Sequence, residues 1–114
     1  MMRVATPETT AWDLVRYPRA AGGLDNVITV LAELSEKLSA KRLRAVVEGH
    51  ADVVVAQRLG YLLDHLGRRS LAKGLADWVT DAPLRPLDPG APTRGAIESR
   101  KWHLLVNVKL EPEA

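Results

Sequence analysis

The sequence predicts an α+β fold in which about five helices are followed by a small antiparallel sheet near the C-terminus. As far as residue 79, apolar residues recur at three- and four-residue spacing, the period of helices with one buried face. Proline and glycine then become frequent between residues 81 and 100. Apolar and polar residues finally alternate from Trp102 to Leu110, which is the period of a half-buried strand.

The first helix is predicted to begin after Thr6, whose hydroxyl can cap its free N–H groups. Pro7 suits the first helical position, and Glu8 complements the positive end of the helix dipole. Pro18 cannot continue the helix, so we expect it to end there. Its expected apolar side consists of Ala11, Trp12, Leu14 and Val15.

Four more helices are predicted to begin near residues 24, 39, 52 and 70. The helix from Asp52 to Leu66 is followed by Gly67, which suits a left-handed helix end. The apolar stripes predict the following buried residues: Leu24, Val27, Ile28, Leu31, Leu34, Leu38, Leu43, Val46, Val47, Ala56, Leu59, Leu62, Leu63, Leu66, Leu71, Leu75, Trp78 and Val79.

The strand predicted at Trp102–Leu110 needs a partner, because one strand cannot satisfy its own backbone groups. Leu84–Leu87 is one candidate, restricted to a sheet edge by Pro86. Met2–Ala5 is the other local candidate, and failing both the partner lies in another chain or in a missing part of this one. Residues 91–100 are expected to form a polar loop.

Length and composition exclude several classes of protein. The 114 residues fit one domain over residues 1–114, and 46% hydrophobic with 26% charged residues is ordinary for a globular chain. The absence of cysteine excludes disulfides, thiolate zinc sites, iron–sulfur clusters and cysteine nucleophiles. No apolar run approaches a membrane span or a signal peptide, so we expect a cytoplasmic protein.

No arrangement of residues predicts catalysis, a cofactor or a metal site. His50, His65 and His103 fall on different elements and lack the helical spacing of zinc hydrolases. Asp64 and His65 are adjacent, so on a helix they point about 100° apart and cannot form a relay. The Gly90–Gly95 loop lacks the Lys and Ser or Thr that follow in a phosphate-binding loop. We expect no enzyme, and an enzyme built from scattered residues ranks last.

The basic residues are mostly arginine, eleven against five lysines, at a net charge of +2. Arginine suits phosphate and carboxylate groups, but arginine with abundant alanine is also typical of a G- and C-rich genome. The clusters are therefore open to two interpretations, contact with nucleic acid or simple solvation. No helix has the polar surface of a recognition helix. The clusters are Lys37 with Lys41, Arg42 and Arg44; Arg68 with Arg69; and Arg94 with Arg100 and Lys101.

Three stretches of the sequence resemble a known family. TPETTAWDLVRYPRAAGGLDNVITVLAEL (6–34) resembles the C-terminal domain of the AbiE-type antitoxins, AbiEi, which are transcriptional regulators of bacterial abortive-infection systems. AQRLGYLLDHLG (56–67) is similar to a second recurrent stretch of that family, and KWHLLVNVKLE (101–111) is similar to its closing segment. The resemblance thus extends over nearly the whole chain.

The resemblance implies a negative autoregulator that binds inverted repeats in its own promoter and counteracts a nucleotidyltransferase-type toxin. Family members usually carry an N-terminal winged helix-turn-helix, which is absent from this sequence, so promoter recognition is expected mainly outside it. The resemblance leaves open whether the toxin is contacted directly. The alternative hypothesis is a DNA-binding module that acts through its arginine clusters without an antitoxin role.

The resemblance also singles out individual residues. Arg16 and Arg19 match the first stretch and are interpreted as contacts to DNA or toxin, or as partners of acids such as Asp13. Gly60 costs a helix about 1 kcal/mol relative to alanine, which predicts a close helix crossing there. For the tryptophans Trp12, Trp78 and Trp102, a position in the core is favoured over a role at an interface. The full set of candidate DNA- or partner-binding residues is Arg16, Arg19, Lys41, Arg42, Arg44, Arg58, Arg68, Arg69, Arg100 and Lys101.

Overall fold

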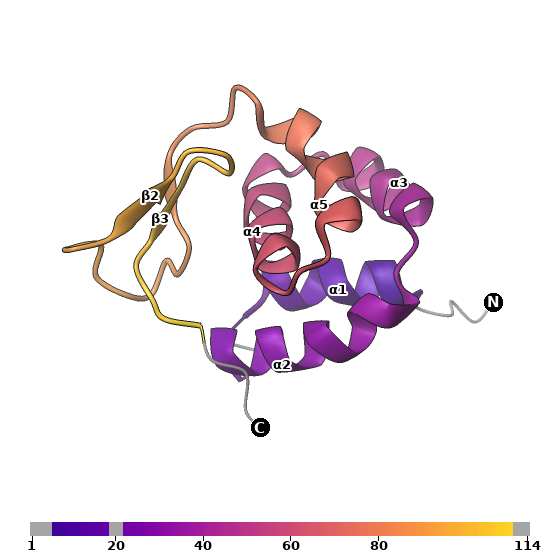
Figure 1. Ribbon diagram of the computed structural model, residues 1–114, viewed down its shortest axis with the longest axis horizontal. Helices are drawn as coiled ribbons and strands as arrows, with labels where there is room; N and C mark the ends of the chain where they lie inside the picture. Colours follow the sequence, from indigo (N-terminus) through magenta and orange to yellow (C-terminus); the bar gives the residue numbers. More distant parts are fainter. Residues whose placement is uncertain (1–5, 19–21, 111–114) are drawn as a thin grey trace.

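A computed structural model describes residues 6–18 and 22–110, and its five α-helices confirm the predicted α+β class. Met2–Ala5 and Arg19 lie outside the described residues. The helix α4 contacts α1 and α5, while the small sheet lies on the side of α4 away from α3 (Figure 1). The helices are α1 (Pro7–Arg16), α2 (Leu24–Leu34), α3 (Ala40–His50), α4 (Val53–His65) and α5 (Arg69–Ala76), with short 3-10 turns η1 (Ser35–Lys37) and η2 (Asp77–Val79). None of these helices has the length and hydropathy needed to cross a membrane.

Three of the helices have a polar side chain as their N-terminal cap. Thr6 Oγ1 accepts a hydrogen bond from Thr9 N at 3.1 Å, which confirms the predicted cap of α1. Ser39 and Asp52 cap α3 and α4 in the same way. At the other end of α4, Gly67 has a φ of +80°, the left-handed geometry predicted for it.

Glu8 lies in the first turn of α1 as predicted, but its side chain also reaches another helix. It is fully buried, and its Oε2 accepts a hydrogen bond from Ser39 N at 2.9 Å. Because Ser39 precedes α3, this bond places a carboxylate at the N-terminus of that helix, where the helix dipole favours negative charge. Glu8 therefore links α1 to the start of α3.

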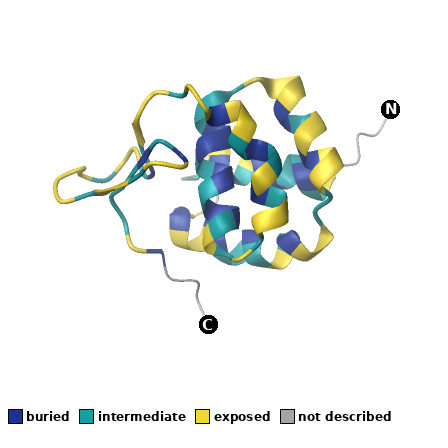
Figure 2. Cartoon of the chain, turned by 45° about the horizontal axis from the view of Figure 1, so that its top comes forward, coloured by how far each residue is buried: buried dark blue, intermediate teal, exposed yellow. Residues whose placement is uncertain are grey.

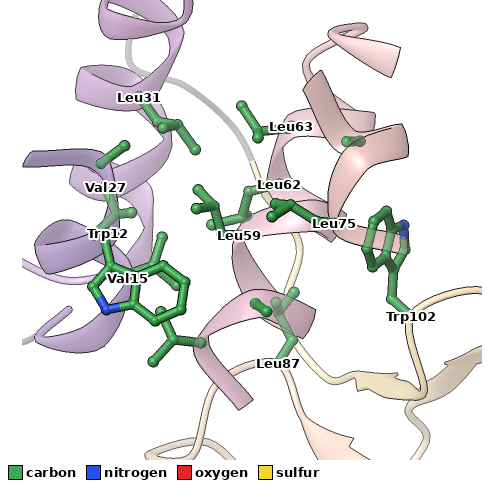
Figure 3. Packing of buried hydrophobic residues seen from close by; sticks show 14 of the residues in the cluster. Trp12, Val15, Val27, Leu31, Leu59, Leu62, Leu63, Leu75, Leu87 and Trp102 are labelled. Atoms are coloured by element: carbon green, nitrogen blue, oxygen red, sulfur yellow. The ribbon is translucent and has the colours of Figure 1, made fainter. Parts of the chain in front are cut away.

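The core lies between α4 and the surrounding helices, and the buried residues lie on the inward sides of the helices (Figure 2). The helix α4 contributes more buried residues than any other helix. Trp12 and Val15 of α1 face Leu59 of α4, while Trp102 packs on another side of α4 (Figure 3). The predicted stripe residues Leu34, Leu38, Val46, Leu66 and Leu71 are only partly buried. One core prediction is wrong: Trp78 is 39% exposed, because it lies in the short turn η2 rather than on a continuing α-helix.

The sheet has three short strands, β1 (Arg85–Pro86), β2 (Ile97–Ser99) and β3 (Leu104–Val106), in the order β1-β3-β2. The predicted edge strand containing Pro86 is confirmed. The sheet is mixed rather than purely antiparallel, because β1 runs parallel to β3 while β2 runs antiparallel to it. The strand β2 lies where a polar loop was predicted.

The long strand predicted from Trp102 to Leu110 is wrong in extent, because only Leu104–Val106 is extended and paired. His103 has a φ of 53°, which breaks the extended backbone before β3. After β3, the Asn107 side chain accepts from Asp88 N at 2.9 Å and donates to the Asp88 and Ala91 carbonyls. Because of these bonds, the chain after β3 forms an irregular segment and does not continue as a paired strand.

Candidate functional site

Residues 83–110, the C-terminal segment, are held on α4 by two polar side chains. The buried Gln57 Nε2 lies 2.9 Å from the carbonyl oxygen of Pro83 and 3.0 Å from those of Trp102 and His103. Arg58 donates from Nε and Nη2 to the Pro86 carbonyl at 3.2 and 3.0 Å. These bonds give hydrogen-bond donors to backbone carbonyl groups of the irregular segment, and the His103 carbonyl also accepts from Arg85 N at 3.0 Å.

Gly60 makes room for the indole of Trp102. A Cβ atom at position 60 would lie 2.1 Å from Trp102 Cζ3, so no larger residue fits without movement. The close approach predicted at Gly60 is therefore present. The neighbour is an aromatic ring from the C-terminal segment, which corrects the prediction of a crossing helix.

Asp64, one turn after Gly60, accepts a hydrogen bond from the same tryptophan. Its Oδ2 accepts from Trp102 Nε1 at 3.0 Å and from Lys101 Nζ at 2.8 Å. Burial raises the pKa of the Asp64 carboxyl, but the hydrogen bonds from Lys101 and Trp102 and the charges of Lys101 and Arg69 outweigh it and leave the pKa below its ordinary value. Asp64 is consequently held as a carboxylate.

Two open cavities flank α4 where it faces the sheet, and they share Tyr61 and His65. We call the two together the α4 groove. The rings of Tyr61 and His65 stack with centroids 6.3 Å apart and planes 20° apart, and burial raises the pKa of Tyr61. The first cavity, about 420 Å³, is also lined by Asp64, Arg69, Ser99, Lys101 and Trp102. The second, about 450 Å³, is also lined by Arg94, Gly95, Ala96, Ile97, Val106, Asn107, Val108, Lys109 and Leu110.

The α4 groove brings together two of the predicted basic residues, Arg69 and Lys101. Lys101 is paired with Asp64 and lies 5.4 Å from the centroid of the Trp102 ring. Arg69 makes no ion pair with any residue in the described part of the chain. The sequence pattern grouped Lys101 with Arg94 in one basic cluster, but it did not connect Arg69 or Lys101 with Tyr61 or Ser99. The four-residue spacing of Tyr61, His65 and Arg69 was the available signal.

A second set of predicted residues lies on α3, away from the groove. Lys41, Arg42 and Arg44 are all exposed, and the Arg44 guanidinium lies near Gly74 of α5. Arg16 is also exposed at the end of α1, with its guanidinium 5.2 Å from the centroid of the Tyr17 ring. Arg100 is exposed in the turn before β3.

Two other predicted residues are engaged in contacts within the fold. Arg58 binds the Pro86 carbonyl, and burial lowers its pKa against the opposing charges of Asp52 and Asp88. Arg68 donates from Nε to Ser35 Oγ at 2.9 Å, which joins the start of α5 to the end of α2. Both guanidinium groups therefore already donate hydrogen bonds to neighbouring parts of the fold.

The histidines lie apart, and the described residues contain no group of three or more His, Asp or Glu side chains arranged to hold a metal. His50 stacks on Trp12 with ring centroids 5.3 Å apart, so its ring contributes to packing between α1 and α3. His65 lines the α4 groove, and His103 forms the turn before β3.

Comparison with known proteins identifies a family for residues 2–65 of the chain. The family model described as AbiEi antitoxin C-terminal domain matches residues 2–65, which include α1 to α4. The match ends before the C-terminal segment, so the similarity described for residues 101–111 stays a prediction. No curated protein and no solved structure shows significant similarity to the chain. The family match covers more than half of the sequence, and the chain belongs to the AbiEi antitoxin C-terminal domain family.

Proposed function

We propose that this domain counteracts a nucleotidyltransferase-type toxin and contributes to repression of its own promoter, without catalytic activity of its own. The observation that carries the proposal is the family match over residues 2–65. An antitoxin and regulatory role is the common property of that family, which is generally non-enzymatic. We further propose that residues 1–114 act as one domain and that promoter sequence is read mainly by a winged helix-turn-helix outside it.

The exposed cations of α3 are the proposed partner-binding face. Lys41 and Arg44 are three residues apart and therefore lie on the same side of the helix, with Arg42 beside them. No ion pair within the described ranges engages any of the three. Solvated cations of this kind steer association with an acidic partner surface and set its orientation.

Growth rescue tests this proposal. Cells expressing the toxin are co-transformed with this chain or with the variant Lys41→Gln/Arg42→Gln/Arg44→Gln, and colonies are counted. We expect the wild type to restore growth and the variant to lose at least tenfold in colony number. The matched control, Glu33→Gln/Glu36→Gln/Asp81→Asn, removes three exposed charges elsewhere and is expected to rescue fully. Equal rescue by all three proteins would contradict a role for the α3 face.

A DNA-binding module acting through the same cations is the second candidate, favoured by their exposure and by the isoelectric point of about 9.2. It predicts affinity for duplex DNA that falls with salt, with a log–log slope of about one unit per phosphate neutralised. The triple α3 variant should then reduce this slope by up to about three units. Absence of duplex binding at low salt would eliminate this candidate.

A further inference from the structure

We propose that the α4 groove binds a nucleotide unit of a single-stranded nucleic acid or a free nucleotide, with a base against the Tyr61–His65 pair and phosphate at the flanking cations. The inference does not depend on the antitoxin role, because it rests on the shape and lining of the groove alone. Each of its two cavities, about 420 and 450 Å³, falls within the usual range of small-molecule sites.

An aromatic pair stands at the centre of the groove. Tyr61 and His65 line both cavities, so a ligand in either cavity has these two residues in its wall. Tyr61 is half-buried and packs against the hydrophobic core, whereas His65 is exposed. One ring of the stacked pair is therefore supported by the core and the other is accessible to a ligand. Base stacking on such a platform does not depend on base identity, since every base has a π-face.

Cations lie on both sides of the aromatic pair. Arg69 and Lys101 line the first cavity, and Arg94 lines the second. The carboxylate of Asp64 also lines the first cavity, but its charge is compensated by Lys101 and its Oδ2 already accepts two hydrogen bonds. The charge facing the groove is therefore predominantly positive, as a phosphate-bearing chain requires.

The remaining wall provides apolar surface beside the rings. Ile97 of β2 is 75% exposed although it is a large apolar residue, and its strand neighbour Val106 lines the same cavity. An acidic peptide would use the cations but has no need of a stacking platform. A duplex would keep its bases paired and away from the rings. The combination of rings, apolar wall and cations favours an unpaired nucleotide over both.

Fluorescence anisotropy with the full chain tests the proposal, using a labelled twelve-residue oligo(dT) as the probe. We expect binding to the single strand that is at least tenfold tighter than binding to a duplex of equal length. GTP and ATP serve as competitors: displacement identifies a site that accepts free nucleotides, whereas strand binding without displacement identifies a strand site. Either result supports the proposal. Absence of binding to the labelled single strand at low salt, together with absence of binding to fluorescently labelled GTP and ATP in the same assay, would overturn it.

Substitutions inside and outside the α4 groove test whether the nucleic acid binds there. His65→Ala removes an exposed ring and should weaken strand binding about tenfold, because base stacking contributes roughly 1–3 kcal/mol per base. Arg69→Gln/Arg94→Gln should lower the salt slope by about 1.4, at about 0.7 per phosphate on single strands. The control Lys73→Gln/Arg85→Gln removes two exposed cations outside the groove and should leave affinity within twofold. Unchanged binding by both groove variants, or equally tight binding of poly-glutamate, would overturn the proposal.

Discussion

Gly60 and Trp102 form a matched pair across the fold, one supplying the space that the other fills. The indole lies where a Cβ atom of residue 60 would be, with 2.1 Å between that position and Trp102 Cζ3. Its Nε1 simultaneously donates to Asp64 one helical turn further along α4. A glycine within the family-matched region thus positions a side chain from the C-terminal segment.

Gly60→Ala should destabilise the protein by about 2 kcal/mol, because overpacking a filled core typically costs 1–3 kcal/mol. In an open helical position the same change stabilises by up to about 1 kcal/mol. Gly49 in α3 is such a position, with no atom within 4 Å of a Cβ added there, so Gly49→Ala is the matched control. The free energies of unfolding in urea should change in opposite directions. Stabilisation by both substitutions would contradict the packing described at Gly60.

Gln57 should be intolerant of substitution, because its amide serves three backbone carbonyls of the C-terminal segment. Gln57→Met preserves size but removes the donors, and we expect a loss of about 2–3 kcal/mol in unfolding free energy, the usual cost of unsatisfied buried groups. Gln57→Glu should cost more at neutral pH, since a carboxylate would face carbonyl oxygens. Urea unfolding measures the free energy of unfolding of the wild type and of the two variants. Wild-type stability in the methionine variant would show that water replaces the amide without cost.

Asp64 should make the stability of the protein dependent on acid pH. Its pKa is lowered in the folded state, so its contribution to stability is present above the unfolded pKa of about 3.9 and is lost as the pH falls through the lower folded value. Asp64→Asn should therefore be less stable than the wild type at pH 7, and the difference should shrink below about pH 4. Thermal unfolding between pH 2.5 and 7 measures both proteins. A difference independent of pH would contradict this assignment.

Ala51 offers a position for stabilisation. It ends α3 with a φ of 52°, a left-handed geometry that glycine adopts without the steric cost of a Cβ atom. Ala51→Gly should stabilise the protein by roughly 0.5–1 kcal/mol, while Ala45→Gly in the exposed middle of the same helix should destabilise it by about 1 kcal/mol. Chemical denaturation measures the free energy of unfolding of both variants. Destabilisation by both would indicate that the α3 terminus differs in solution.

Local patterns were sufficient to predict most of the helical body. The cap at Thr6 and the left-handed Gly67 depend only on near neighbours in the sequence, and both predicted features are present. The alternation from Trp102 to Leu110 predicted too long a strand. His103 reverses the backbone there, and Asn107 binds residues 16 to 19 positions earlier, a contact that no local period reveals.

The candidate site was less predictable, because it depends on contacts between distant segments. Basic residues were identified by type, yet Arg58, Arg68 and Lys101 bind partners between 28 and 37 positions away. The α4 groove likewise joins Tyr61 with Ser99 and Arg94, and these contacts depend on how the C-terminal segment crosses α4. The family match covers α1 to α4, whereas the α4 groove also involves residues beyond that match.

Colony formation over a range of toxin induction tests directly whether this chain has the proposed antitoxin activity. Cells express the proposed nucleotidyltransferase-type toxin together with this chain or with an empty vector. Cells that express a catalytically inactive toxin give the reference for full growth. We predict that the chain restores colony number to the inactive-toxin level at low and intermediate induction. Colony numbers equal to the empty vector at every induction level, with the chain folded and present in the cells, would contradict it.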